Sequence, residues 1–370
     1  TTTLQALRVA EHEAVPPDAT LKNQLARNAA RSKLRDQLER CVAEIRRVPG
    51  FEGFLAPVRA ANIQATLPGS SKVVYLLVTS AGGLALILGP DAIAAVGLSF
   101  SLRDLRRLLL PELLGAASPG YLHAVVEDAR DEQDVIERTA ATIGHSIVDP
   151  LWPHLQSTPD DTSPDKPSLY LIPTGTLSVL PLHAASSESH PALIERFAVS
   201  LLPSARLLTR PARLRHPDPG SLLVVGDPGP ISAPNEGRLP GARFEARSVA
   251  RLSKGNALLL LDHDASANAV RAAWRHVETV HLSCHGIFDP DVPLRSRLSL
   301  AGNDELTLGR IVADRTDYAG PHHVVMSACQ TALNDLAHLP EEVIGFPAAF
   351  LQCGAETAVG TLWSVGDVPS

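Results

Sequence analysis

The stretch TVHLSC (279–284) is the pattern on which the fold depends, because it belongs to a set of short aliphatic runs. A run of this length is too short for an amphipathic helix and predicts a buried strand. Runs of the same character are SLYLIP (168–173), SLLVVG (221–226), ALLLLD (257–262), HHVVMS (322–327) and TAVGTLW (357–363). Helical patterns at 242–252 and 266–277 separate some of them. Strands that are apolar on both faces and alternate with helices predict an α/β fold, with a mostly parallel sheet and helices on both faces.

Upstream of these strands, the sequence predicts a helical segment followed by an α+β region. Residues 21–47 place Leu34 and Leu38 at helical spacing among charged residues. This helix either packs on the next domain or is the last helix of a longer helical-repeat region, since a single helix cannot show a repeat period. Two further helical patterns occupy 101–114 and 121–148.

The apolar run from Val73 to Leu88 has two interpretations, a membrane-spanning helix or a β-hairpin. It is shorter than the roughly 20 residues that a spanning helix needs. Gly82 and Gly83 divide it into two short apolar halves, which is typical of a hairpin. We therefore predict a hairpin and no membrane segment.

A proline-rich stretch, residues 149–168, marks the predicted domain boundary. It contains five prolines, and proline at this density disfavours both a helix and a central strand. The predicted organisation is a helical segment at 1–60, an α+β subdomain at 61–155 and a parallel α/β subdomain at 168–370.

The composition excludes several classes of protein. Apolar residues make up 45% of the 370 residues and charged residues 20%, which is typical of a chain with a packed core. The net charge of −7 argues against direct binding along a nucleic-acid backbone. The four cysteines, at 41, 284, 329 and 353, are isolated and too few for a disulfide framework. With no signal peptide at the start, they predict reduced thiols in a cytoplasmic protein.

Reactive side chains follow two of the predicted strands. The segment VHLSCHG ends in His285 and Gly286, and the segment VVMSACQT leads into Cys329. The carboxyl ends of parallel strands meet at one edge of the sheet, which is where such folds place their ligand sites. We therefore expect His285 and Cys329 to lie at the same edge.

A cysteine beside a histidine forms a candidate nucleophile–base pair. The thiolate is the reactive form of cysteine, and the imidazole of His285 could take the proton from Cys329. The backbone N–H of Gly286 is a candidate oxyanion donor because no side chain blocks it, and the N–H of Cys329 is a second. The alternative is a structural Cys329, since buried cysteines are common as small hydrophobic residues. The residues alone leave both interpretations open.

Other chemistries fit these residues less well. His281 and His285 would lie roughly 13 Å apart along a strand, too far to bind one zinc ion. The chain has no CxxC, so we predict no metal site, and it has no GxSxG of a serine hydrolase. The turn at Gly226-Asp227-Pro228 lacks the lysine of a phosphate-binding loop, so we predict no nucleotide cofactor.

Several segments, taken together and in order, resemble the CHAT domain, a caspase- and separase-like cysteine peptidase module often found beside tetratricopeptide repeats. They are LYLIPTGTLSVLPLHAA (169–185), SLLPSARLL (200–208), LLVVGDP (222–228), LPGARFEA (239–246), VHLSCHG (280–286), VVMSACQTA (324–332) and GFPAAFLQCGAETAVGTLWSVGD (345–367). Residues 60–150, with their Gly-Gly hairpin, are similar to the segment that usually precedes the core. The resemblance implies a caspase-like fold and a cysteine endopeptidase.

The resemblance also assigns roles to individual residues. It implies a dyad in which His285 is the base and Cys329 the nucleophile, with Gly286 at the oxyanion position. A backbone carbonyl or Asp289 would set the tautomer of His285. It implies a protein substrate, and control by a regulatory protein, a ribonucleoprotein or an attached helical module. The alternative is a catalytically silent caspase-like scaffold that binds partner proteins.

Two further expectations follow from the resemblance. In related separases an Asp after the last core strand selects a basic P1 side chain, which makes Asp367 a candidate floor of the S1 pocket. The alternative for Asp367 is a turn or a helix cap. A CHAT domain also usually continues into a final helix or two, so we expect these helices to be missing, disordered or on another chain.

Overall fold

The structure is a computed structural model of the chain. It describes residues 21–54, 56–115, 120–127, 132–155, 166–210, 218–229, 237–253, 255–289, 292–313, 320–333, 343–364 and 366–367. The chain divides into two compact units, Thr1–Arg59 and Ala60–Ser370, and each is described by itself.

The first unit is represented by one long helix, α2 (Leu21–Ile45), which confirms the helix predicted at 21–47. Leu34 and Leu38 are half-buried, whereas most of the charged residues around them are exposed. This one-sided burial is what the helical spacing of the apolar residues predicts.

The first sheet combines three consecutive antiparallel strands with two later strands. Its strands are β1 (Lys72–Thr79), β2 (Gly82–Leu88), β3 (Ile93–Leu98), β4 (Ser168–Pro173) and β5 (Ala198–Leu201), in the order β3-β2-β1-β4-β5. β1 and β2 pair antiparallel with Thr79 opposite Gly82, which confirms the predicted hairpin. β1 and β4 pair parallel, as do β4 and β5. The sheet is therefore mixed.

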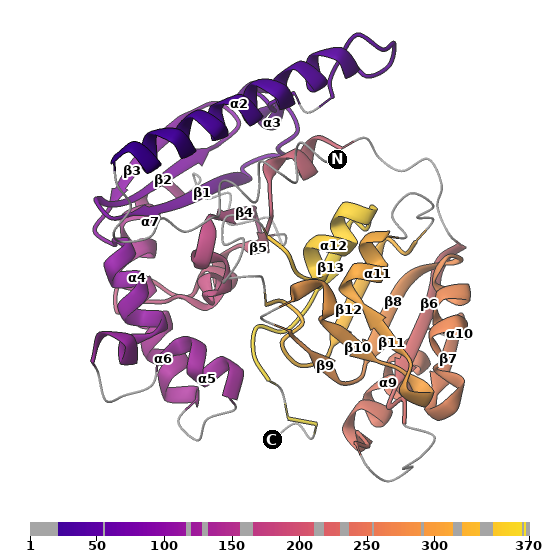
Figure 1. The fold of residues 1–370 in the computed structure, drawn as a ribbon. Helices are drawn as coiled ribbons and strands as arrows, with labels where there is room; N and C mark the ends of the chain where they lie inside the picture. The colour runs from indigo at the N-terminus through magenta and orange to yellow at the C-terminus, as the bar shows by residue number, and fades with distance from the viewer. Residues whose placement is uncertain are drawn as a thin grey trace. The chain divides into compact units, whose positions relative to one another are not determined.

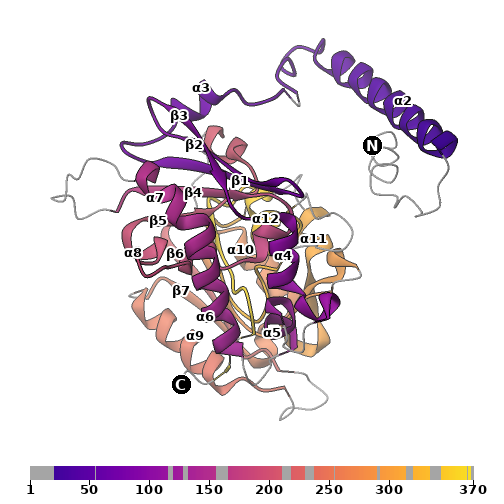
Figure 2. The same ribbon diagram turned by 90° about the vertical axis from the view of Figure 1, so that its left-hand side faces the viewer.

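In Figure 2, α4 (Leu102–Leu109), α5 (Tyr121–Glu127) and α6 (Glu132–Ile143) lie on one side of this sheet. The other helices of this part of the chain are α3 (Ala60–Gln64), a π-helix (Gly144–Val148), α7 (Asp149–Leu155) and the short α8 (Leu193–Arg196). Ser101 and Asp104 form a capping box at the start of α4. Their core is continuous with the first sheet.

The proline-rich stretch begins as a helix, contrary to our expectation that its prolines would exclude one. α7 contains Pro153, and its residues Leu151, Trp152 and Leu155 are buried. A proline inside a helix removes the hydrogen bond of its own nitrogen, and its ring crowds the carbonyl of the residue four positions earlier. Here the burial of three apolar side chains outweighs that cost.

The second sheet contains five parallel strands and confirms the predicted α/β architecture (Figure 1). Its strands are β6 (Asp218–Gly226), β7 (Ala257–Leu261), β8 (Val277–Ser283), β12 (His323–Ser327) and β13 (Thr357–Val359), in the order β13-β12-β8-β6-β7. The helices are α9 (Pro240–Leu252), α10 (Ala267–Trp274), α11 (Leu308–Ala313) and α12 (Phe346–Cys353).

Helices lie on both faces of the second sheet, as predicted. Val280 and Leu282 of β8 join a core with Trp274 of α10 and Phe350 of α12. On the opposite face, Gly226 leaves so little room that an added Cβ would lie 2.3 Å from the Cβ of Ala246 in α9. The sheet is therefore covered on both sides, which explains why its strands are mostly apolar.

Smaller elements complete the fold. A three-stranded antiparallel sheet contains β9 (Gly286–Ile287), β10 (Arg297–Ser299) and β11 (Glu305–Thr307), in the order β11-β10-β9. The 3-10 helices are Pro111–Leu114, Gly175–Val179, Leu182–Ala184, Ala205–Thr209, Asp262–Asp264, Pro293–Arg295 and Ala301–Asn303. Within the described residues, no helix is both long enough and apolar enough to cross a bilayer.

The change from one sheet to the other does not coincide with the proline-rich stretch. β4 and β5 follow that stretch but belong to the first sheet, and the second sheet begins with β6. The subdomain boundaries at 61–155 and 168–370 stay a prediction, but the strands after residue 168 are shared between two sheets.

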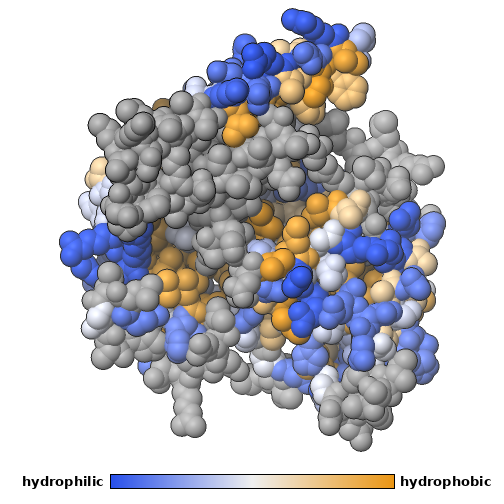
Figure 3. All heavy atoms as spheres, in the orientation of Figure 1, coloured by the Kyte–Doolittle hydropathy of each residue, from blue (hydrophilic) through white to orange (hydrophobic). Residues whose placement is uncertain are grey.

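An apolar cavity of about 1140 Å³ lies between the open edges of the two sheets. Residues of β5, β13 and α12 line it, and neither His285 nor Cys329 does. Figure 3 shows hydrophobic residues gathered in the middle of the face seen in Figure 1, while hydrophilic residues cover much of its right-hand side.

Candidate active site

The ends of β8 and β12 lie side by side at the carboxyl edge of the second sheet. Ser283 of β8 is directly opposite Ser327 of β12 in the parallel register. His285 and Cys329 each follow two residues after these paired serines. The sequence prediction that both residues emerge at one edge of the sheet is therefore confirmed by the strand pairing.

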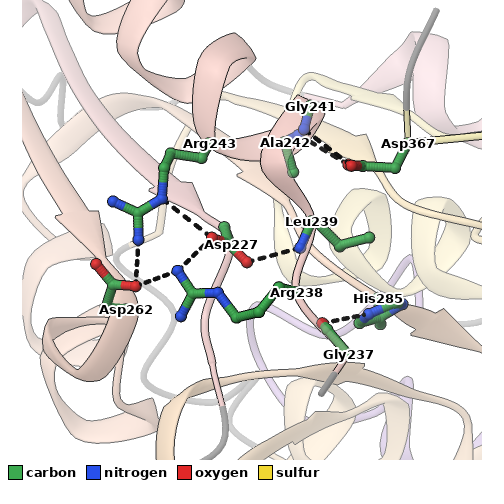
Figure 4. A network of polar contacts seen from close by, with 10 residues as sticks. All are labelled: Asp227, Gly237, Arg238, Leu239, Gly241, Ala242, Arg243, Asp262, His285 and Asp367. Atoms are coloured by element: carbon green, nitrogen blue, oxygen red, sulfur yellow. Dashed lines mark hydrogen bonds and ion pairs between the residues drawn. The ribbon is translucent and has the colours of Figure 1, made fainter. Parts of the chain in front are cut away.

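A backbone carbonyl contacts the ring of His285. Its Nε2 lies 2.8 Å from the carbonyl oxygen of Gly237, which precedes α9 (Figure 4). A carbonyl can only accept a hydrogen bond, so Nε2 must carry a proton. In the neutral ring this leaves the lone pair on Nδ1, the atom that could accept a proton.

The alternative partner for His285, Asp289, is engaged in its own turn. An oxygen of its carboxylate accepts the N–H of Val292 at 2.8 Å. Of the two groups that could set the His285 tautomer, the structure favours the carbonyl of Gly237.

Gly286 approaches the backbone of Cys329 so closely that no side chain fits. An added Cβ would lie 2.4 Å from the carbonyl oxygen of Cys329 and 3.3 Å from the Cβ of Ala328. Ser299 donates its N–H to the carbonyl of His285 at 2.9 Å, so the adjacent pair, Gly286 and Leu298, is not hydrogen-bonded across the ladder. The N–H of Gly286 therefore points away from β10.

Cys329 lies at a tight turn. Gln330, directly after it, has a φ of +56°, a left-handed conformation that costs energy for a residue with a side chain. The N–H of Gln330 donates to the carbonyl of Trp363 at 3.3 Å. On the other side of the cysteine, the carbonyl of Ala328 accepts the Thr361 hydroxyl at 2.6 Å. These contacts hold the turn in place.

The environments of the cysteines differ. Cys329 is partly exposed, Cys41 is exposed, and Cys284 and Cys353 are buried; all four are free thiols. Burial, with a smaller contribution from Cys329, raises the pKa of Cys284 to about 12. Cys284 is therefore a protonated, unreactive thiol at neutral pH, although it adjoins His285 in the sequence.

Asp367 binds the start of α9. Its two carboxylate oxygens accept the N–H groups of Gly241 and Ala242 at 2.9 Å and 3.0 Å (Figure 4). The N-cap residue of this helix, Leu239, has no side-chain oxygen, so Asp367 fills the capping role from a distant part of the chain. These contacts are those of the helix-cap alternative for Asp367. The role of Asp367 as the floor of an S1 pocket stays a prediction.

Two arginines and two aspartates form an ion network that the sequence analysis missed (Figure 4). Asp227 and Asp262 directly follow β6 and β7, and Arg238 and Arg243 each contact both carboxylates. Burial opposes ionisation of Asp262, but its hydrogen bonds to the two arginines outweigh burial and lower its pKa.

This network fixes the segment that carries the Gly237 carbonyl. Asp227 is buried, and it also accepts the N–H of Leu239 at 2.8 Å. The sequence does contain a signal for this ion network. An aspartate directly follows each of two strands, and the two arginines are five residues apart. The local sequence around Asp227 predicts only a turn.

His281 and His285 have separate partners. Nε2 of His281 lies 3.0 Å from Oε1 of Glu245 in α9, whereas His285 contacts Gly237. Within the described part of the chain, no group of three His, Cys, Asp or Glu side chains is arranged to hold a metal ion.

A family model for the CHAT domain matches residues 137–370. The chain belongs to the CHAT domain family. The CHAT match contains the second sheet, its helices and both strand ends that carry His285 and Cys329. No curated protein matches the chain. The CHAT assignment and the parallel sheet between two helix layers agree with the caspase-like, peptidase-related fold that the resemblance implied.

Proposed function

We propose that this CHAT-domain chain is a cysteine endopeptidase in which Cys329 is the nucleophile and His285 the base. The observation that carries the proposal is the pairing of the two strand ends, with Nε2 of His285 bound to a carbonyl that leaves Nδ1 as the basic atom. Family membership supports it, because the CHAT domain is related to caspase-like peptidases.

The reaction would proceed in two stages. Nδ1 of His285 takes the thiol proton of Cys329, and the sulfur bonds to the scissile carbonyl carbon. The negative charge that develops on oxygen would be stabilised by the N–H groups of Gly286 and Cys329. The C–N bond then breaks as His285 returns the proton to the amine, and water hydrolyses the acyl-enzyme by the reverse proton path.

The substrate class and control of the enzyme are part of the same proposal. We expect a protein substrate, and activity that depends on a regulatory protein, a ribonucleoprotein or an attached helical module. A basic P1 residue bound by Asp367 is a further expectation, and it requires Asp367 to serve the substrate as well as α9.

The decisive experiment combines turnover with thiol labelling. Wild type, Cys329→Ala and Cys284→Ala are incubated with a peptide library and with candidate activators. Cleavage that disappears only in Cys329→Ala would support the proposal, whereas cleavage undiminished by that substitution would contradict it. Cys284→Ala is the matched control, because that thiol precedes His285 directly and is buried.

Labelling distinguishes a peptidase from a non-catalytic scaffold. An electrophilic thiol probe should modify Cys329 faster than the exposed Cys41, and His285→Ala should slow that reaction. Equal rates at Cys41 and Cys329, with activators present, would favour the scaffold.

A further inference from the structure

The carboxylate of Glu245 in α9 connects the two strands that carry the proposed dyad. Its Oε2 accepts the hydroxyl of Ser283 at 2.6 Å and the hydroxyl of Ser327 at 2.9 Å. Its Oε1 lies 3.0 Å from Nε2 of His281. One oxygen atom therefore bridges β8 and β12 at their last paired residues.

This bridge lies directly before the two residues of the proposed dyad. Ser283 and Ser327 are the final residues of their strands, and each precedes a dyad residue by two positions. Beyond them the regular pairing of the two strands ends, since β8 leads into β9 and β12 enters the turn at Gln330. The bridge is therefore a side-chain tie at the point where the strand pairing ends.

Two of the three partners of Glu245 are buried, whereas the side chain of Glu245 itself is 37% exposed. Ser283 is 1% exposed and His281 8% exposed, so their polar atoms depend on protein partners. Burial tends to raise the pKa of Glu245, but the hydrogen bonds from His281, Ser283 and Ser327 outweigh it and lower that pKa. Hydrogen bonds to an ionised carboxylate are roughly twice as strong as neutral ones.

The segment that precedes α9 contacts the proposed base. This segment supplies the carbonyl of Gly237 that binds His285, and α9 itself supplies Glu245. The helix and the segment before it together contact the ring of the proposed base and both strands that carry the dyad.

We propose that Glu245 is a positioning residue that sets the separation of His285 and Cys329 through Ser283 and Ser327. The inference rests on the proposed function of the dyad. Glu245 itself takes no part in proton transfer, since its partners are the two serines and His281.

The test measures the alkylation rate of Cys329 by iodoacetamide from pH 5 to pH 9, with peptide mass spectrometry as the readout. It uses the full chain as wild type, His285→Ala, Glu245→Ala and Glu245→Gln. The exposed Cys41 is an internal reference for reagent and pH. Ser248→Ala is the matched control, because that hydroxyl lies in α9 and donates to the carbonyl of Phe244 in the same helix.

The expected result is a graded loss. Glu245→Ala should slow alkylation of Cys329 at neutral pH by about tenfold to a hundredfold. Moving a reacting group by about 1 Å can reduce a reaction rate by up to about a hundredfold. The pH profile of Glu245→Ala should approach that of His285→Ala. Glu245→Gln should lose at most about threefold, since one amide oxygen can still accept both serine hydroxyls with weaker bonds. Ser248→Ala should match the wild type.

The outcomes separate the two proposals. If His285→Ala leaves Cys329 alkylation unchanged, the dyad fails and the inference falls with it. If His285→Ala slows the reaction and Glu245→Ala does not, the dyad stands and the positioning role is wrong. Should Glu245→Ala not fold, the double variant Ser283→Ala, Ser327→Ala replaces it. A wild-type alkylation profile in that double variant overturns the inference.

Discussion

At the scale of single residues, the site depends on the small size of Gly286 as much as on the reactive side chains beside it. Gly286 has no side chain, and this lets its backbone approach the carbonyl of Cys329. The conformation of Gly286 does not itself require glycine, since its φ is outside the left-handed region. The requirement is one of space, and it predicts how the position tolerates substitution.

Replacing Gly286 by alanine should separate the two strand ends. The new methyl group would lie 2.4 Å from the carbonyl oxygen of Cys329, so the backbone must shift. We expect a destabilisation of about 1–3 kcal/mol, typical of overpacking, and slower alkylation of Cys329. Urea unfolding and the alkylation assay measure the two effects.

Gly97→Ala is the control for this substitution. Gly97 lies in β3, where an added Cβ has no neighbour within 4 Å. Alanine there should leave alkylation unchanged. Equal effects at both positions would show that the space at Gly286 has no special role.

The residues of the site were predictable in part. His285, Gly286 and Cys329 could be named because each follows an apolar run, and strand ends can be read from a single sequence. Gly237 could not, since it precedes a helix. Only the tertiary approach of that segment to the residues after β8 gives it a role.

At the scale of elements, the start of α9 is capped by two aspartates from other parts of the chain. Asp367 accepts the N–H groups of Gly241 and Ala242, and Asp227 accepts that of Leu239. Unpaired N–H groups at a helix start require such partners. Asp227, directly after β6, and Asp367, in the segment that follows β13, provide them here.

Asp367→Ala should therefore weaken the fold. Loss of a helix cap typically costs about 1 kcal/mol, and Asp367→Asn should recover most of it because asparagine is also a good cap. Denaturant unfolding of both variants tests the capping role. Unchanged stability together with lost cleavage after Arg or Lys would instead identify Asp367 as the S1 floor.

The ion network predicts sensitivity to acid. The pKa of Asp262 is lowered in the folded chain from its ordinary value of 3.8, because Arg238 and Arg243 outweigh its burial. A depressed pKa contributes stability above the unfolded value, and this contribution is lost as the pH falls through the folded value. We expect Tm to fall below about pH 4 in the wild type.

Asp262→Asn isolates this effect. The variant should have a lower Tm than the wild type at pH 7, and the difference should shrink as the pH approaches 2. A constant difference across that range would contradict the contribution of the Asp262 carboxylate.

At the scale of the whole molecule, the sequence predicted the strands better than their partners. The hairpin at Gly82 and the parallel arrangement of β6, β8 and β12 follow from local patterns. The place of β4 in the first sheet does not follow from a local pattern, because SLYLIP has the same apolar character as strands of the second sheet. Its partner β1 lies far away in the chain, and only long-range packing selects it.

A fragment of residues 168–370 should therefore fail to fold stably. It would expose Leu169 and Leu171, each 1% exposed in the structure, and would lose the pairing of β4 with β1. Residues 60–370 retain that pairing and should fold. Circular dichroism and thermal melting of both fragments compare them, and a cooperative melt of 168–370 would show that the predicted subdomain is independent.

The capping of α9 by Asp367 joins positions 126 and 125 residues apart and has a consequence for ligand binding. Free energy is a state function, so two events that each change the order of one helix end must influence each other equally. A ligand that draws Asp367 away from α9 should destabilise the segment whose Gly237 carbonyl binds the His285 ring. Conversely, a substrate that stabilises this contact should, by the same free energy, make Asp367 harder to displace from α9.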